Sequence, residues 1–409
     1  MCIGQIGNLL PHVVVPAVMV QYLIPLWGMT NTQAGLLASA YAAGYMLAVP
    51  FLSSLTDRYD ARRILLLGSL CSGLSTLAFA FFATSWLTGV FIWGLAGASF
   101  AGAYMPGLRA LTDRLETADA SRSITLYTAS YSMGVGFSFL VSQLVADAYG
   151  WRWSFGITGL GPLIMAFVAW RMKPVLPITK EGHLLDVRPV LRNRPAMAYI
   201  LSYGAHCFEL YGFRTWLVAF WTFVISRHQG DSLPDAMTVS FLASLLAMPA
   251  SILGNELSLR FGRARAISWI QVISALTALS IGVLAGGSAW VILVLIFIYA
   301  VTVPADSGSL TAGMMSYAQP QFKGLTLAMH STVGFRAIGF VGLDGRTGIR
   351  FSWRHSRSTS MAGCVWCAGS RCHAGAIGFE VTEELNDLMT KSYWLFIQLF
   401  EFLIMTWTI

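Results

Sequence analysis

The stretch that decides the fold is residues 266–305, AISWIQVISALTALSIGVLAGGSAWVILVLIFIYAVTVPA, which contains no Asp, Glu, Lys or Arg. A helix that spans a bilayer needs about 20 mainly apolar residues, so this stretch is long enough for two crossings. Three other uncharged runs cover residues 1–56, 64–108 and 123–146. Over all 409 residues, 56% are hydrophobic and only 11% are charged, against about 25% charged in soluble domains. The sequence therefore excludes soluble globular domains and a disordered chain, and it predicts a multi-spanning membrane protein.

The uncharged runs predict helices, because only helices and closed barrels satisfy their backbone polar groups in lipid and barrel strands have only about ten residues. We expect an all-α integral membrane protein with six spans before a charged segment and at least four after it. The expected spans are 4–26, 34–55, 64–83, 87–108, 123–146, 154–171, 196–225, 236–257, 267–286 and 290–315. The expected domains are an N-terminal bundle (1–172), a cytoplasmic linker (173–194), a C-terminal bundle with helices seven to ten and the start of an eleventh (195–342), and an anomalous polar tail (343–409).

The basic residues predict the orientation of the chain. Sixteen Lys and Arg residues lie in the breaks on one side of the expected helices, whereas only Arg152 and Arg227 lie on the other side. The positive-inside rule makes the first side cytoplasmic and places the amino terminus there too. The excess of 26 basic over 19 acidic residues is then explained by topology, so we expect the lipid bilayer and no nucleic acid as a partner. The first run lacks the basic region and cleavage site of a signal peptide, and we expect it to remain as the first helix.

A charged motif occurs twice, at breaks about half the chain apart. The first copy is SSLTDRYDARR at 53–63, and the second is GNELSLRFGRAR at 254–265. A weaker repeat pairs Met105-Pro106 with Val303-Pro304. Internal repeats of this size are typical of transporter folds.

In this paired motif and its topology, residues 1–340 resemble the major facilitator superfamily (MFS). The family pattern is Gly-x-Leu-Ala-Asp-Arg-x-Gly-Arg-Arg. The first copy keeps Leu55, Asp57, Arg58 and Arg62, with Ser53 and Asp60 in place of the glycines; the second keeps Gly254, Gly262 and the arginines but has no acidic residue at the matching place. The resemblance implies two six-helix bundles related by a pseudo-twofold axis, and transport by alternating access.

The resemblance also implies a gate, an ion network on the inward face that stabilises the outward-open state. The gate residues are Asp57, Arg58, Arg62, Arg63, Arg260 and Arg263. The alternative is that these charges only fix the topology, and Asp57 is the informative residue because an acid adds nothing to the positive-inside rule. Expected helix five lacks the Gly-Pro motif of drug/proton antiporters, and helix four has Trp93 where many proton-coupled members carry arginine. These departures disfavour drug antiport.

Ionisable residues inside the spans are the first candidates for the substrate and ion path, because charge at that depth is costly. His206 and Glu209 are three residues apart and share a helical face, and Arg214 follows on the same helix. Glu209 or His206 could bind a proton or cation, and Arg214 an anionic substrate; the alternative is an internal network that only locks the helix. Asp306 follows Pro304 in helix ten and is either a substrate or proton site or an ion-pair partner of Arg214 or Arg336.

Helix one carries Gln5, Asn8 and His12 on one face of apolar sequence. We expect Gln5 and Asn8 to form interhelical hydrogen bonds and His12 to face the cavity. Tyrosine pairs one turn apart in helices two and five are explained by aromatic packing or by substrate stacking; they are Tyr41 and Tyr45, and Tyr127 and Tyr131.

The helical pattern fails after about residue 342. Residues 343–375 are rich in Arg, Ser, Gly and Cys, and either a displaced reading frame or a genuine soluble tail explains them. The tail includes Cys364, Cys367, Cys372 and His373, which resemble metal ligands; because they lie in this anomalous tail and a four-ligand site needs more than proximity, we expect no metal and no cofactor.

We therefore expect a secondary transporter for a small polar or anionic solute, proton-coupled or not, in a bacterial inner membrane and acting as a monomer. The alternatives are a membrane enzyme, disfavoured because no catalytic or metal motif lies in the spans, and an MFS-derived chain that no longer transports and has a structural or sensory role.

Overall fold

The computed structural model describes residues 1–115, 120–178, 183–228 and 232–344, with side chains of the last helix described as far as Arg336. This part of the chain contains helices and no strand. The all-α fold predicted from the sequence is confirmed.

The first half of the chain forms nine α-helices and one short π-helix, η1. They are α1 (Cys2–Leu9), α2 (Val14–Val18), η1 (Met19–Leu23), α3 (Ile24–Trp27), α4 (Asn31–Leu55), α5 (Ala61–Phe82), α6 (Trp86–Ala101), α7 (Tyr104–Thr112), α8 (Ala120–Tyr149) and α9 (Trp151–Arg171). The linker helix α10 and the second half of the chain follow. Its elements are α10 (Arg188–Arg192), α11 (Arg194–Arg227), α12 (Ala236–Phe261), α13 (Arg263–Val283), α14 (Ala289–Ala305), α15 (Ser307–Tyr317), the 3-10 turn η2 (Pro320–Phe322) and α16 (Lys323–Asp344).

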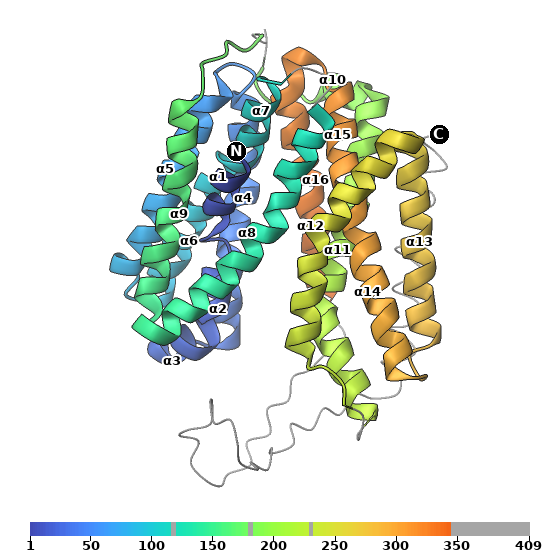
Figure 1. Cartoon of the computed structure of the whole chain (residues 1–409). Coiled ribbons are helices and arrows are strands. Elements are labelled where there is room, and N and C mark those ends of the chain that lie inside the picture. Colours follow the sequence, from blue (N-terminus) through green and yellow to red (C-terminus); the bar gives the residue numbers. More distant parts are fainter. Residues whose placement is uncertain (116–119, 179–182, 229–231, 345–409) are drawn as a thin grey trace.

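Eight spans among the described residues are long and apolar enough to cross a membrane, with α6–α7 and α14–α15 each counted as one. A ninth is added if the bent N-terminal helices are one span. The helices α11 and α16, of 34 and 22 residues, run alongside them (Figure 1). The protein is a multi-pass membrane protein.

The first span is not the continuous helix that the sequence predicts over residues 4–26. It is broken between Leu9 and Val14, and the two pieces are bent by 43°. Pro11 lies in this break and Pro16 in the next helix; proline has no N–H to donate and its ring clashes with the preceding turn. Helix ten is likewise divided, at Asp306, two residues after Pro304.

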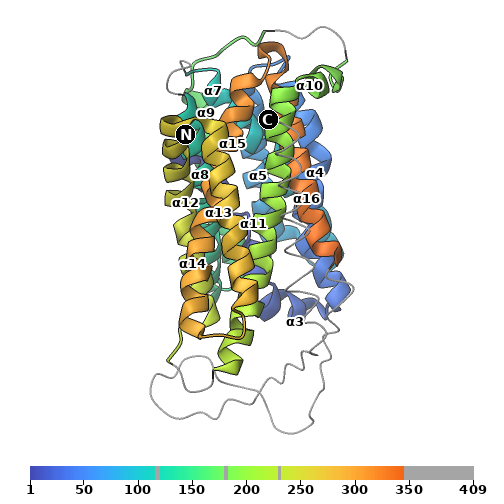
Figure 2. The same ribbon diagram turned by 90° about the vertical axis from the view of Figure 1, so that its right-hand side faces the viewer.

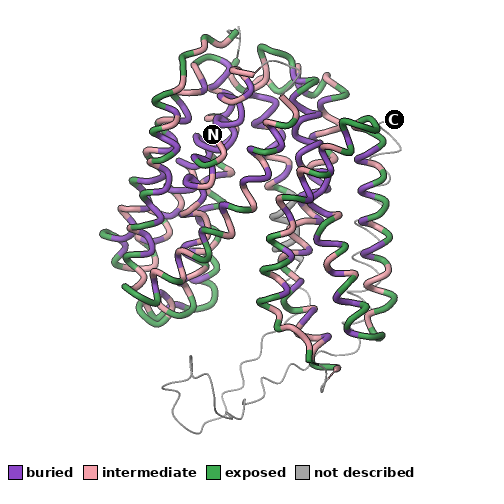
Figure 3. The backbone as a smooth tube through the Cα atoms, in the orientation of Figure 1, coloured by how far each residue is buried: buried purple, intermediate pink, exposed green. Residues whose placement is uncertain are grey.

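The helices form two bundles that lie close together at one end and apart at the other. In Figure 1, α4–α9 and α11–α14 converge toward the end that carries α7, α10 and α15 and diverge toward the end that carries α3. We call the first of these the Asp57 end and the second the Gly28 end. Each bundle has its own buried apolar cluster, and buried residues face the inside of the bundles while exposed ones face outward (Figure 3). The cluster of the first bundle also includes Met314 and Leu325 of the second, so the two bundles share part of their core at the Asp57 end.

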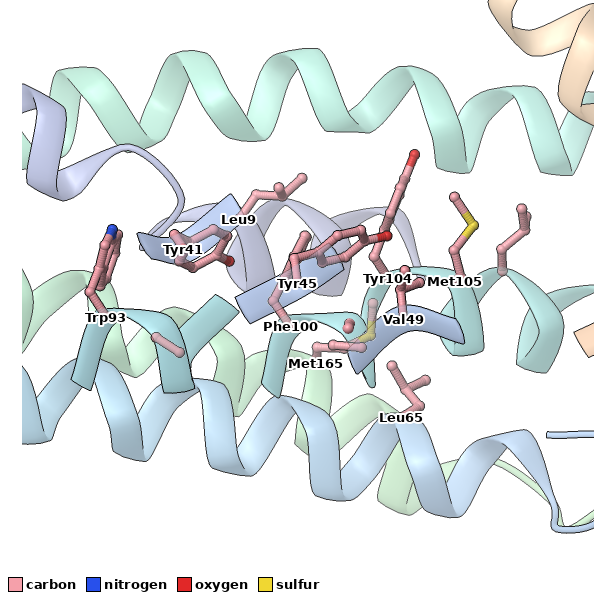
Figure 4. Packing of buried hydrophobic residues seen from close by; sticks show 14 of the residues in the cluster. Leu9, Tyr41, Tyr45, Val49, Leu65, Trp93, Phe100, Tyr104, Met105 and Met165 are labelled. Atoms are coloured by element: carbon pink, nitrogen blue, oxygen red, sulfur yellow. The ribbon is translucent and has the colours of Figure 1, made fainter. Parts of the chain in front are cut away.

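Close packing of α4 on α6 depends on glycine. A Cβ atom at Gly44 would overlap the carbonyl oxygen of Gly94, and one at Gly97 would overlap the carbonyl oxygen of Tyr41. Small residues allow this approach of two backbones inside a membrane. The packing holds α4 in place, and α4 presents Tyr41 and Tyr45 beside Trp93 and Phe100 (Figure 4).

Candidate substrate cavity, ionisable network and gate

A cavity of about 160 Å³ lies between the two bundles. Aromatic rings form most of its wall. The first bundle contributes His12, Pro16, Ala38, Tyr41, Ala42, Tyr45 and Trp93, and the second contributes Tyr211 and Phe335. Because both bundles supply wall residues, a relative movement of the bundles would change the shape of the cavity.

The structure places His12 in this wall, on the side of the first bundle. Its Nε2 lies 2.8 Å from the hydroxyl of Tyr131, and its ring packs edge-on against Tyr41 with centroids 5.2 Å apart. Gln5 and Asn8 lie deeper and are fully buried. Gln5 Oε1 accepts a hydrogen bond of 2.9 Å from the Tyr127 hydroxyl, which is the interhelical contact expected for that residue. The same expectation is wrong for Asn8, whose side-chain amide has no hydrogen-bond partner among the described residues.

Two buried carboxylates lie inside the second bundle, held by one face of α13. Glu209 Oε1 accepts hydrogen bonds of 2.8 Å from Ser274 Oγ and from the Tyr299 hydroxyl. Asp306 Oδ2 accepts one of 3.0 Å from Gln271 Nε2. Gln271 and Ser274 are three residues apart on α13, so they lie on the same helical face. Neither residue was predicted as part of a site from the sequence. The feature that could have marked them is a pair of polar residues at helical spacing in an apolar helix.

His206 brings α11 and Asp306 together. Its Nδ1 lies 2.8 Å from Asp306 Oδ1, and both side chains are buried. The alternatives that Asp306 pairs with Arg214 or Arg336 are wrong, because in the folded chain its neighbours are His206 and Gln271. Sequence spacing could not show this, since the break after Pro304 determines which way Asp306 points.

Arg214 reaches across to the first bundle. Its Nη2 donates a hydrogen bond of 3.4 Å to Ser132 Oγ on α8, and its guanidinium lies 5.9 Å from the centroid of the Tyr211 ring. Tyr211 lines the cavity. Arg214 is thus the positive charge that the structure places beside this wall.

Asp57 closes the Asp57 end by capping a helix of the opposite bundle. Its Oδ1 accepts a hydrogen bond of 2.7 Å from the Gly324 amide, and its Oδ2 one of 2.9 Å from the Leu325 amide. These amides belong to the first turn of α16, where backbone N–H groups lack helical partners and the helix dipole favours a negative charge. Arg109, at 3.3 Å, pairs with the same carboxylate and also with Asp113 at 2.8 Å. Position 324 has no room for a residue larger than glycine, because a Cβ there would overlap Thr56 Oγ1.

A second set of contacts mirrors the first. Asn255 Oδ1, near the end of α12, accepts a hydrogen bond of 2.9 Å from Ser121 at the start of α8. Glu256 accepts two from Arg122, at 2.7 and 3.0 Å, and Arg263 donates one of 3.0 Å to Ser121. The end of α4 thus meets the start of α16, and the end of α12 meets the start of α8, as a pseudo-twofold repeat requires.

Of the other predicted gate residues, one bonds within its own bundle and three lie at the surface. Arg62 donates to the carbonyl oxygens of Ala169 and Trp170 at the end of α9, in its own bundle. Arg58, Arg63 and Arg260 are exposed. Conversely, five residues that make contacts at this end were not predicted: Arg109, Ser121, Arg122, Asn255 and Glu256. The contacts that tie them into this end join residues 52 to 142 positions apart along the chain, so no local pattern marks them.

Within the described ranges, no group of three or more His, Cys, Asp or Glu side chains is arranged to hold a metal ion. The tail residues Cys364, Cys367, Cys372 and His373 lie outside these ranges.

The fold and the cavity define a class of protein: a multi-pass membrane protein in which two helical bundles enclose a cavity and close one end of it. A sequence model described as Major Facilitator Superfamily matches residues 1–343, and the chain belongs to that superfamily. The relatives and the fold are those of transporters and not of enzymes.

The chain is also similar to individual transporters. It is 22% identical over 209 residues to Protein spinster homolog 1 of Homo sapiens, covering 46% of this chain and 39% of that protein. It is 26% identical over 178 residues to the inner membrane transport protein YnfM of Escherichia coli (strain K12), covering 42% and 41%. With the probable sphingolipid transporter spinster homolog 1 of Arabidopsis thaliana it shares 23% identity over 150 residues, covering 36% and 30%. The matches span between 30% and 41% of these relatives' lengths.

A solved structure has a similar fold. The bacterial homologue of the iron transporter ferroportin, in an outward-facing state, aligns with a TM-score of 0.71, covering 100% of this chain and 97% of that chain. Its sequence identity is 14%, so the similarity is one of fold.

Proposed function

We propose that the chain is a secondary active transporter that moves a small polar or anionic solute by alternating access. The observation that carries this proposal is the capping of α16 by Asp57 from the opposite bundle, at the closed end of a cavity whose wall comes from both bundles. A contact of this kind holds one state and must break in the other.

The cavity favours a solute that combines an apolar part with a negative charge. Aromatic faces such as those of Tyr41 and Trp93 bury apolar or ring surface. Arg214, beside Tyr211, is suited to a carboxylate or phosphate because its guanidinium donates two parallel hydrogen bonds. His12 supplies a further polar group in the wall.

The second bundle is the proposed site of ion coupling. Glu209 and Asp306 are buried with hydrogen-bonded partners, and His206 Nδ1 lies 2.8 Å from Asp306 Oδ1. Ionisable groups at membrane depth are typical of proton and ion pathways. We propose protons as the coupling ion, since an imidazole next to a carboxylate binds and releases them readily.

We propose that the Asp57 end faces the cytoplasm, because the basic breaks lie there, and that the membrane is a bacterial inner membrane. The proposed functional unit is a monomer with bundles 1–172 and 195–342, joined by the linker 173–194, which starts close to the first bundle: the Val175 amide donates a hydrogen bond of 3.0 Å to Asp60 Oδ2.

Asp57→Asn is expected to shift the chain toward the state that is open at the Asp57 end. The substitution removes the charge that two α16 amides and Arg109 bind, and a hydrogen bond to a charged group contributes about 1.5–3 kcal/mol. The shift should therefore be about tenfold or more. It can be measured as the labelling rate by a charged thiol reagent of two reporters in a cysteine-free background: Thr56→Cys, buried at the gate, and Ala38→Cys, in the cavity wall.

We expect labelling to become faster at position 56 and slower at position 38. The matched control is Asp147→Asn, which changes the same chemical group within the first bundle, where Tyr22 and not Arg109 binds it, and should leave both rates close to those of the parent. Unchanged rates at both positions in the Asp57→Asn protein would count against the gate and the alternating-access proposal.

A further inference from the structure

The helix α16 makes three kinds of contact within eight residues. Its first-turn amides, at Gly324 and Leu325, bind Asp57. His330 follows, fully buried inside the second bundle. The next residue, Ser331, is 2.8 Å from the hydroxyl of the cavity residue Tyr45. Figure 2 shows α16 between α11, which carries His206, and α4, which carries Tyr45. One rigid helix therefore touches the gate, the interior of the second bundle and the cavity wall.

His330 lies next to the ionisable network without being part of its hydrogen bonds. Its ring stacks on Tyr203, with centroids 3.8 Å apart, and the Tyr203 ring in turn stacks on His206 at 5.7 Å. The two imidazoles therefore lie against the same phenol ring. His330 Nε2 is 3.3 Å from Thr311 Oγ1, while its Nδ1 has no hydrogen-bond partner among the described residues.

The charges around His206 make proton binding the simplest way to neutralise the network. The titratable and charged groups around this network come from four helices and the turn before α15. They are Tyr203, Cys207, Glu209 and Arg214 on α11, Tyr299 on α14, Asp306 in the turn, His330 on α16 and Tyr45 on α4. The helix α13 adds only the uncharged donors Gln271 and Ser274. A proton on His206 neutralises the charge of Asp306. Because Arg214 is directed to Ser132 of the first bundle and not to Glu209, a second proton neutralises Glu209. Loss of either proton leaves an uncompensated charge in the bundle, which is costly unless water enters.

We propose that His330 passes protons between the His206–Asp306 pair and the Asp57 end, and that it does so only after Asp57 has released the first turn of α16. The proposal rests on the proposed function, because it assumes the gate and the proton coupling. A neutral imidazole takes up a proton at one ring nitrogen and gives up another from the second. The free Nδ1 is the atom that can receive a proton from water admitted by the open gate, and the proton lost from Nε2 passes through the Thr311 hydroxyl or that water to His206.

The test uses the full chain in detergent and needs no substrate. A protonated Glu209 gives a carboxylic C=O band in the infrared spectrum, which Glu209→Gln should remove. Transfer into heavy water then reports how fast the proton of this group exchanges, because deuteration shifts the band. We expect slow exchange in the parent, exchange at least tenfold faster with Asp57→Asn, and a return to within twofold of the parent rate when His330→Gln is added to Asp57→Asn.

Ser331→Ala is the matched control, since it changes the neighbouring position on α16 and removes the Tyr45 contact without touching the network; with Asp57→Asn it should leave exchange fast. A second variant, His330→Asn, gives an independent reading if His330→Gln does not fold. Fast exchange that persists without His330 overturns the relay, as does a carboxylic band that survives Glu209→Gln. Slow exchange in the Asp57→Asn protein also overturns it, and the cysteine labelling of that protein shows separately whether the gate proposal has failed.

Discussion

Replacing Arg109 by methionine is expected to lower the free energy of unfolding by about 3–5 kcal/mol, because removal of one member of a buried ion pair leaves the other charge uncompensated. Arg109 and Asp57 are 3% and 1% exposed, so water cannot replace the lost guanidinium. Asp113 loses its partner as well. Methionine retains the apolar part of the side chain, and the loss therefore reports on charge and hydrogen bonding. Reversible unfolding in mixed detergent micelles measures it.

The exposed pair of Arg122 and Glu256 provides the matched control. It also joins two helix ends, but its side chains are 64% and 33% exposed, and surface ion pairs contribute little. Arg122→Met should leave the free energy of unfolding nearly unchanged. Adding Asp57→Asn to Arg109→Met should recover part of the loss, since the orphaned charge is removed. If Arg109→Met and Arg122→Met had equally small effects, Arg109 would not be the partner that stabilises Asp57.

Gly44→Ala is the second large change. The added methyl group would overlap the carbonyl oxygen of Gly94 and would lie 2.8 Å from its carbonyl carbon. Because both atoms belong to a backbone, α4 and α6 must move apart, and such overpacking costs about 1–3 kcal/mol. The displaced helix carries Tyr41 and Tyr45 in the cavity wall. Unfolding in the same micelles measures the loss, and the thiol labelling rate of the Ala38→Cys reporter detects the change in the cavity.

Gly35→Ala is the control on the same helix. No atom lies within 4 Å of a Cβ at this position, and alanine is the better helix former by about 1 kcal/mol. We expect this variant to be as stable as the parent or more so. A loss of stability in Gly35→Ala equal to that in Gly44→Ala would show that the effect comes from the helix itself and not from its contact with α6.

Part of the ionisable network could be predicted from the sequence. Charge inside a long apolar run is rare enough to mark Glu209, Arg214 and Asp306, and helical spacing puts His206 beside Glu209. That Gln271, Ser274 and Tyr299 bind these carboxylates could not be predicted, because they lie 65 to 90 residues from Glu209 or 35 from Asp306 along the chain. His330 was missed for the same reason: a lone histidine in α16 has no local signal, and only its stacking on Tyr203 connects it to the network.

The proposed gate, too, could be predicted from the sequence only in part. The motif at residues 53–63 marks Asp57 by its resemblance to the superfamily pattern, yet the three arginines of that motif, at positions 58, 62 and 63, either are exposed or bind their own bundle. The charge that completes the gate is Arg109, 52 residues away.

The sequence by itself determined the class of the protein, the approximate spans and the repeat. Membrane insertion depends on the hydrophobicity of about 20 consecutive residues, and helical periodicity acts over three or four, so both are written in local sequence. Only the tertiary structure decided which helix Asp57 caps, where the spans break, how α13 joins two carboxylates and that α16 links the gate to the network. Those outcomes depend on contacts between residues far apart in the chain. Such contacts form only when the helices of both bundles pack together.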